Sequence, residues 1–256
     1  MILVICLTAF VAALLTFFSG FGLGTLLSPV FMLFFPVDIS IALTGIVHFF
    51  NNLFKLALMG KMADRGILVR FGIPSVLAAM LGAWLLMRLS GFYPLYHVDL
   101  FGHDNPVSPL KFTVALLLML FAAMELIPAL EKMRFSKDKL IIGGALSGFF
   151  GGLTGNQGAL RSAFLINAGL SKDAYLGTAV VVSSLVDFTR IGIYASQFKA
   201  TGISVHWQLL TAATLSAMTG AFIGNKLFKK VTMGFVRYFV AIFLLLIAIG
   251  LGTGLI

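Results

Sequence analysis

The sequence predicts an all-α polytopic membrane protein, a helical bundle of two inverted repeats that each contain a broken, re-entrant helix hairpin. Three features predict this fold: the composition, two uncharged interruptions of the apolar sequence, and an uneven distribution of charge. Of the 256 residues, 60% are hydrophobic and 11% are charged, and the mean hydropathy is +1.06. Because soluble domains have about 25% charged residues, the polar residues here could not cover a globular surface. Part of the protein surface must therefore face lipid.

Long apolar runs follow one another along the chain, and a membrane helix needs about 20 such residues. Two interruptions, Ser19–Thr25 and Gly151–Gly158, contain no charged residue. The runs that follow them, 26–36 and 159–170, are too short to span a bilayer alone. The runs are 1–18, 26–36, 39–60, 67–89, 110–130, 140–153, 159–170, 174–195, 207–228 and 234–256.

The two interruptions are related by an internal repeat. We therefore divide the chain into a first membrane repeat, 1–130, and a second membrane repeat, 136–256. At a constant offset of 135 residues, three pairs align: Ser19-Gly20 with Thr154-Gly155, Asn52 with Asp187, and Lys55 with Arg190.

The distribution of Lys and Arg predicts the topology. If each broken segment were a full span, these cations, with Arg161 left out, would divide 10 to 7 between the two sides. If each is a re-entrant hairpin, the division is 13 to 4, which the positive-inside rule favours. This gives six full spans, two hairpins and extracytoplasmic termini. The four cations outside are Arg88, Lys111, Arg190 and Lys199. The net charge of +9 then orients the chain near anionic lipid and indicates no nucleic-acid binding.

Two breaks at matching positions of an inverted repeat indicate a transporter binding site. Each break begins a short helix, and helix N-termini offer free N–H groups and a favourable dipole to an anion. We expect the two N-termini to face one another near the midplane. The alternative is that the glycines only permit tight helix packing. The expected substrate-binding residues are Gly22, Gly24, Thr25, Ser28, Asn52, Asn156, Gln157, Gly158, Arg161 and Ser162.

Charged residues within the spans are the next candidates. Arg161 is a cation in an apolar helix, which costs about 3 kcal/mol unless it is paired. Its guanidinium suits an oxyanion, and an internal ion pair is the alternative. Asp187 either neutralises Arg190 or Arg161, or acts as a proton-coupling carboxylate. We expect His48 to be a satisfied core histidine and Glu125, near a span end, to be solvated.

Other functions find little support. We expect no His–Asp, Cys–His or paired-acid set within the spans, which argues against a membrane-embedded enzyme. The lone Cys6 provides neither a disulfide nor a cysteine metal site. His97, Asp99, His103 and Asp104 in the loop 91–109 fit no strong metal motif, so we interpret this loop as an extracellular cover or a partner contact. We expect neither a metal nor a cofactor. Gly220-x-x-x-Gly224 packs helices within or between subunits.

The segment Ser19-Gly20-Phe21-Gly22-Leu23-Gly24, followed by Pro29, resembles the glycine-rich signature of the sulfite exporter TauE/SafE family of permeases. The resemblance covers essentially the whole chain in length and repeat layout. The second half departs from the pattern at Thr154-Gly155-Asn156-Gln157-Gly158-Ala159, at Arg161, and at Phe164 in place of a proline.

The resemblance implies a multi-pass permease of the cell membrane for a small sulfur-containing anion, such as sulfite, sulfoacetate or another organosulfonate. We expect it to work by alternating access, with the anion held between the facing half-helix N-termini. An anion channel is the first alternative, and a membrane-embedded enzyme is the second.

Overall fold

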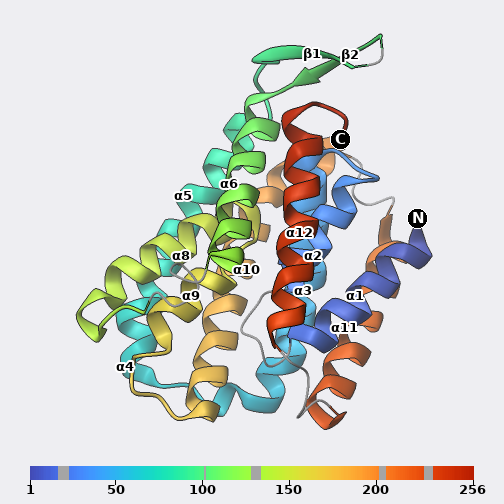
Figure 1. The fold of residues 1–256 in the computed structure, drawn as a ribbon. Coiled ribbons are helices and arrows are strands. Elements are labelled where there is room, and N and C mark those ends of the chain that lie inside the picture. The colour runs from blue at the N-terminus through green and yellow to red at the C-terminus, as the bar shows by residue number, and fades with distance from the viewer. Residues whose placement is uncertain (17–22, 101, 128–133, 202–205, 228–232) are drawn as a thin grey trace.

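Helices form nearly all of the computed structural model, which describes residues 1–16, 23–100, 102–127, 134–201, 206–227 and 233–256 (Figure 1). The expected all-α polytopic bundle is confirmed. In chain order the elements are α1 (Ile2–Thr16), α2 (Leu23–Met32), α3 (Val37–Met59), η1 (Gly60–Met62), α4 (Arg65–Ile67), the π-helical turn η2 (Leu68–Gly72), α5 (Ile73–Leu89), β1 (Tyr96–Leu100), β2 (His103–Val107), α6 (Pro109–Leu126), η3 (Lys137–Lys139), α8 (Leu140–Thr154), α9 (Gly158–Leu165), α10 (Lys172–Thr201), α11 (Trp207–Leu227) and α12 (Met233–Gly252).

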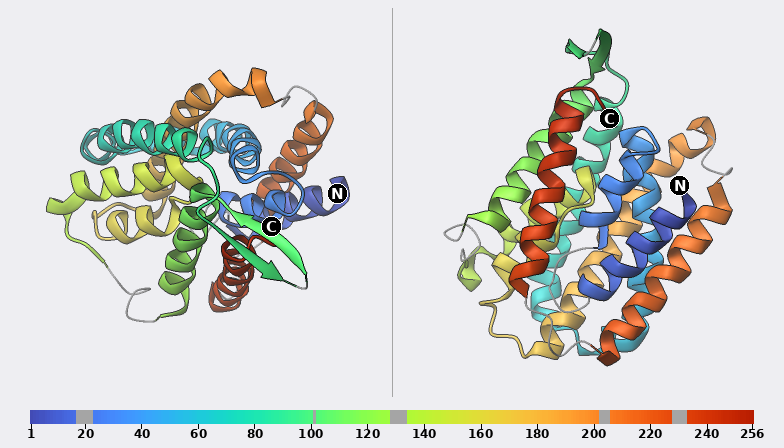
Figure 2. Two further views of the ribbon diagram at one scale, coloured as in Figure 1. Left: turned by 90° about the horizontal axis from the view of Figure 1, so that it is seen from above. Right: turned by 45° about the vertical axis from the view of Figure 1, so that its right-hand side comes forward.

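Several of these helices have the length of a membrane span. In the described part of the chain, four helical segments are long and apolar enough to cross a bilayer. Two further long helices, α11 and α12, have 21 and 20 residues and run beside the others (Figure 2). At 1.5 Å per residue, each of these two reaches about 30 Å. The four segments are Val37–Met62, Arg65–Leu89, Pro109–Leu126 and Lys172–Ala195.

The helices α8 and α9 form a hairpin that enters and leaves at one end of the bundle. Before α8, the Phe135 N–H donates to the Ala163 carbonyl of α9 at 3.1 Å. The rings of Phe135 and Phe164 stack with their centroids 4.2 Å apart. Gly143, near the start of α8, lies against the Phe164 ring near the end of α9. The start of α8 and the end of α9 therefore lie side by side, which is the arrangement that a re-entrant hairpin requires.

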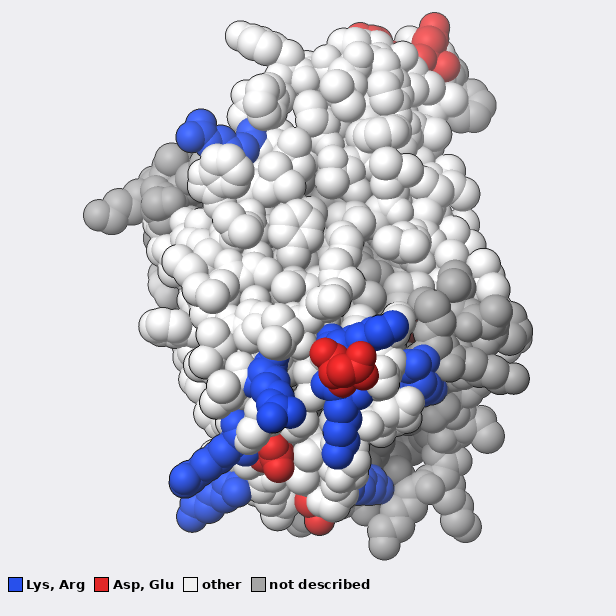
Figure 3. Space-filling view, turned by 90° about the vertical axis from the view of Figure 1, so that its left-hand side faces the viewer, with Lys and Arg blue, Asp and Glu red and all other residues white. Residues whose placement is uncertain are grey.

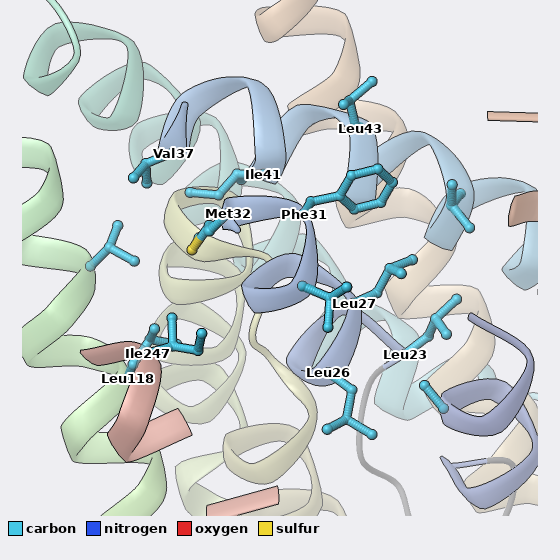
Figure 4. Close-up of a cluster of buried hydrophobic side chains, with 14 of the residues drawn as sticks. Leu23, Leu26, Leu27, Phe31, Met32, Val37, Ile41, Leu43, Leu118 and Ile247 are labelled. Carbon is cyan, nitrogen blue, oxygen red and sulfur yellow. The ribbon is translucent and has the colours of Figure 1, made fainter. Parts of the chain in front are cut away.

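The helices α1 and α2 also lie against one another. Leu7 and Val11 of α1 line one small apolar pocket together with Val30 and Leu26 of α2. Every residue of α2 is buried. Figure 4 shows its side chains enclosed by α3, α6 and α12. A short helix at membrane depth thus has protein on all sides, as interrupted backbone in a bilayer requires.

Glycines allow two close helix crossings that mirror one another. On α8, Gly148 backs onto the Ser75 carbonyl of α5, where an added Cβ would lie only 2.0 Å away. On α11, Gly220 backs onto the Phe10 carbonyl of α1, where the distance would be 2.2 Å. The first helix of each predicted repeat therefore packs against a later helix of the other repeat. The Gly220-x-x-x-Gly224 motif packs helices within the chain.

Charge separates the two ends of the bundle. Lys and Arg gather at the end opposite the β-strands, below a wide band of surface without charged side chains (Figure 3). At this basic end Lys61, Arg65, Arg70, Lys137, Lys139 and Lys172 are exposed. The two chain ends lie toward the other end (Figure 1). This matches the side that the charge count predicts for the termini.

The loop 91–109 contains a β-hairpin that the sequence reasoning did not expect. Its strands β1 and β2 pair antiparallel, with Tyr96 opposite Val107. The Tyr96 hydroxyl donates to the Gly252 carbonyl at the end of α12, at 2.8 Å. The hairpin therefore forms an ordered cover at the end of the bundle that carries the termini.

Replacing Gly148 by Ala is expected to destabilise the bundle. The added methyl would strike the Ser75 backbone, and overpacking of this kind costs about 1–3 kcal/mol. Gly192→Ala is the matched control, because nothing lies within 4 Å of its added Cβ. Thermal unfolding of both variants in detergent measures the difference. Equal midpoints would contradict the close crossing of α5 and α8.

Cysteine labelling tests the sidedness. In a Cys6→Ser background, Tyr93→Cys beside β1 is expected to react with an impermeant maleimide on intact cells, since Tyr93 is exposed. Lys137→Cys at the basic end is expected to react only after permeabilisation. Labelling of both positions on intact cells, or the reverse order, would refute the predicted orientation.

Candidate functional site

The two helix breaks meet inside the bundle. A Cβ added to Gly24, at the start of α2, would lie 3.1 Å from the carbonyl oxygen of Gly155. Gly155 ends α8 with a φ of 80°, a left-handed conformation that favours glycine. Thr44 of α3 borders the same point, with its Cγ2 3.6 Å from that Cβ position. We call this contact of Gly24 and Gly155 the break junction. The predicted site residue Gly22 lies outside the described residues.

A small pocket beside the break junction brings three predicted site residues together. Thr25 comes from the first break, and Asn156 and Gly158 come from the second. Thr25 and Asn156 are buried. In the described part of the chain, the side-chain oxygens of Asn156 and Gln157 have no hydrogen-bond partner. Amide side chains can turn NH₂ donors toward a ligand. The remaining lining residues are Phe121, Glu125, Ala159 and Leu244.

Glu125 differs from its prediction. It is only 9% exposed and lines this pocket, so the expectation of a solvated carboxylate is wrong. The reason is that the end of α6 lies beside the break junction and not at the surface. The position of Glu125 near the end of an apolar run does not reveal that its side chain is buried beside the break junction.

A second polar cluster centres on Asp187 of α10, which is fully buried. One carboxylate oxygen lies 2.6 Å from His48 Nδ1 and accepts from Asn52 Nδ2 at 2.9 Å. The other lies 3.0 Å from Arg190 Nε and 2.8 Å from Nη2. Asp187 thus pairs with Arg190, as the structural alternative predicts. The amide of Asn52, a predicted substrate contact, is used by Asp187.

The contact of His48 with Asp187 corrects one expectation. The spans do contain a His–Asp pair, although its members are 139 residues apart. Sequence reasoning missed it because spacing along one helix does not detect partners on two helices. His48 is a satisfied core histidine, as expected. The neighbouring Asn51 is also buried, and in the described residues its amide has no partner.

Arg190 lies directly behind the second break. Its side chain is 1% exposed, and its Cζ lies 3.3 Å from the Cβ position of Gly45 on α3. Its Nη1 lies 2.6 Å from the Cβ position of Gly155, so a larger residue at either glycine would displace the guanidinium. Tyr194, one turn further, donates its hydroxyl to the Gly152 carbonyl of α8. The charge count placed Arg190 among the cations outside, and this is wrong: its side chain is buried within the bundle, where it pairs with Asp187.

Arg161 projects from the first turn of α9 toward α10. It is 6% exposed, and its Nη1 donates to the Ser183 hydroxyl. Lys55 of α3 is 8% exposed and lies within electrostatic range of Arg161. The two cations repel one another where water is scarce. Lys55 is the repeat counterpart of Arg190, which is the sequence signal that marked it.

The two predicted serines differ in their contacts. Ser162 accepts a hydrogen bond from the Tyr175 hydroxyl at 2.9 Å. Ser28 is 1% exposed, and in the described residues its hydroxyl has no partner. Ser28 is therefore the stronger ligand candidate of the two.

The buried charges around the break junction are mainly positive. The cations Lys55, Arg161 and Arg190 are buried, and so are the carboxylates of Asp187 and Glu125, the latter at the pocket. A charged side chain at membrane depth is costly, so an excess of one sign there needs a reason. The described residues contain no group of three or more His, Cys, Asp or Glu that could hold a metal ion. Such a positive interior suits a small anion.

Replacing Gly155 by Ala is expected to destabilise the protein more than Gly169→Ala. Both glycines have a left-handed φ, of 80° and 75°. Alanine is strained in this conformation, so each variant is expected to lose about 1 kcal/mol of folding stability. At Gly155 the methyl also meets the buried Arg190, whereas at Gly169 it meets the flexible end of Lys137. Thermal midpoints in detergent check this, and a Gly169 variant that is equally destabilised would show that the Arg190 contact contributes nothing.

Comparisons with known proteins identify the family. The model of the sulfite exporter TauE/SafE family matches residues 5–251. Searches of curated proteins and of solved structures found no match. The family consists of integral membrane transporters of sulfur-containing anions, not of enzymes. Since the match covers nearly the whole chain, this protein belongs to the sulfite exporter TauE/SafE family of multi-pass membrane transporters.

Proposed function

We propose that the protein carries sulfite, sulfoacetate or another organosulfonate across the membrane by alternating access. The anion would sit at the break junction, between the N-termini of α2 and α9. The observation that carries this proposal is the excess of buried cations in this part of the bundle: Lys55, Arg161 and Arg190 stand against Asp187 and Glu125.

The helix ends at the break junction support an anion in particular. The backbone N–H groups in the first turn of a helix have no partner within that helix, and the helix dipole favours negative charge there. The N-terminus of α2 brings Thr25 to the pocket, and that of α9 brings Gly158. Asn156 and Gln157 add side-chain amides. A sulfite or sulfonate group has several oxygens to accept from such donors.

Arg161 fits the entry side of this site. It stands on the first turn of α9, and with Lys55 it forms a pair of like charges within the bundle. We propose that an anion moving between the basic end and the break junction passes this pair and relieves their repulsion. A guanidinium can bind two oxyanion oxygens at once.

The helix packing suggests which parts would move. We propose that residues 1–130 and 136–256 are inverted repeats, in line with the mirrored crossings of α1 on α11 and of α8 on α5. The moving bodies would then mix helices of both repeats: α1, α2 and α11 in one, and α5, α8 and α9 in the other. Close glycine contacts hold each body together, so rocking would open the break junction to either side.

A second possible role for Asp187 is to couple transport to proton movement, but its contacts favour the structural role. The contacts of its carboxylate with Arg190, His48 and Asn52 support the structural role.

Flux into proteoliposomes tests the function. Wild-type protein is expected to take up radiolabelled sulfite or an organosulfonate, and Arg161→Ala is expected to lose at least about tenfold in rate, because a charge-assisted hydrogen bond is worth about 1.5–3 kcal/mol. Arg70→Ala, an exposed cation at the same basic end, is the control and should transport normally.

Each result has a consequence. No uptake of any of these anions by the wild type would refute the proposed substrate class. Normal uptake by Arg161→Ala would remove Arg161 from the pathway. Anion current far above carrier turnover would select a channel in place of a carrier.

A further inference from the structure

One edge of the Arg190 guanidinium, at Nη1, is turned away from Asp187 and makes no hydrogen bond of good geometry with the described residues. Its Nε and Nη2 face one oxygen of Asp187, at 3.0 and 2.8 Å. Among the described residues, nothing accepts a hydrogen bond from Nη1. The Tyr194 hydroxyl lies within hydrogen-bonding and electrostatic reach of the guanidinium, and it donates its own proton to the Gly152 carbonyl. A buried guanidinium donor without a well-placed acceptor is costly, so such a donor is available to a ligand.

The unused edge points at the break junction. Nη1 lies 2.6 Å from the Cβ position of Gly155, and the Gly155 carbonyl lies 3.1 Å from the Cβ position of Gly24. Two other buried groups near this point also lack a partner among the described residues, namely the Thr44 hydroxyl and the Asn156 side-chain oxygen. Polar groups from α3, α10 and the second break thus converge where the two broken helices meet.

Asp187 fixes the direction of the guanidinium. His48 and Asn52 hold its other oxygen at 2.6 and 2.9 Å, so the carboxylate cannot rotate without losing them. Gly45 and Gly155 confine the guanidinium from both sides. The side chain is therefore preorganised, which reduces the entropy lost when a ligand binds.

We propose that Arg190 binds the transported oxyanion directly, through its Nη1 edge at the break junction, and that Asp187 is its positioning residue. This inference rests on the proposed function and adds a binding residue to it. The ligand class is an anion with two or more oxygens on one centre, such as sulfite or a sulfonate. The competing role for Arg190 is to neutralise Asp187 and support the turn at Gly155.

A charge-balanced double variant separates the two roles. Asp187→Asn/Arg190→Gln removes both charges and retains side chains of similar size. If Arg190 only neutralises Asp187, this variant should bind radiolabelled sulfite as the wild type does. If Arg190 binds the anion, the variant should remain folded but bind roughly 10- to 100-fold more weakly, the range expected for a lost charge-assisted hydrogen bond. Equilibrium binding to purified protein gives the affinities, and the thermal midpoint reports folding.

Arg190→Lys provides a second test that does not depend on the double variant. It keeps a cation beside Asp187 but loses the planar fork, so it is expected to fold and to bind sulfite at least about fivefold more weakly. Arg88→Lys is the control, because Arg88 stacks over Trp84 at the far end of α5.

The outcomes also distinguish the two proposals. A wild type that binds neither sulfite nor an organosulfonate would refute the proposed function. A wild type that binds sulfite, together with a folded double variant or Arg190→Lys of unchanged affinity, would overturn only the assignment of Arg190.

Discussion

A helix that stops in the middle of a membrane leaves backbone N–H and C=O groups that lipid cannot satisfy. Two such interruptions, at Gly24 and Gly155, determine how the rest of this bundle is arranged. Each broken segment must be enclosed by protein, and α2 is buried over its whole length. The long helices α3 and α10 border the point where the breaks meet, and glycine crossings hold α1 and α8 against α11 and α5. The cost of interruption is thereby confined to one small region.

The interior around the break junction contains buried charged side chains, whereas the rest of the described bundle interior is mainly apolar. Most of the Lys and Arg side chains that the structure describes lie at one end of the molecule, but Lys55, Arg161 and Arg190 are buried. Asp187 balances one of them through direct contact with Arg190. An excess of positive charge at membrane depth is costly. A transported anion would supply the missing charge when it binds, so the same cations that weaken the empty protein favour its loaded state.

Much of the fold was predictable because it follows from properties summed over many residues of the chain. Composition predicted the membrane, the repeat offset matched Gly20 with Gly155, and the charge count favoured hairpins over full spans. The β-hairpin at Tyr96–Val107 was not predicted, although Tyr96, Val98 and Leu100 alternate with His97 and Asp99, because a pattern of only five residues between two membrane spans was interpreted as a polar loop. The candidate site was predicted only in part. Residues of the breaks, Thr25, Asn156 and Gly158, do come together. The contact of His48 with Asp187 and the position of Glu125 depend on which helices are neighbours, and spacing along a single chain does not contain that information.

The central claim is that the interior of this protein is built to hold a sulfur oxyanion. Thermal unfolding of the purified wild type against a panel of small anions tests it most directly. A ligand that binds only the folded state and is present at 100 times its Kd adds about 2.7 kcal/mol of stability. Sulfite and organosulfonates are expected to raise the midpoint well above chloride, nitrate and acetate at equal ionic strength. A midpoint that does not respond to any of these anions would contradict the account.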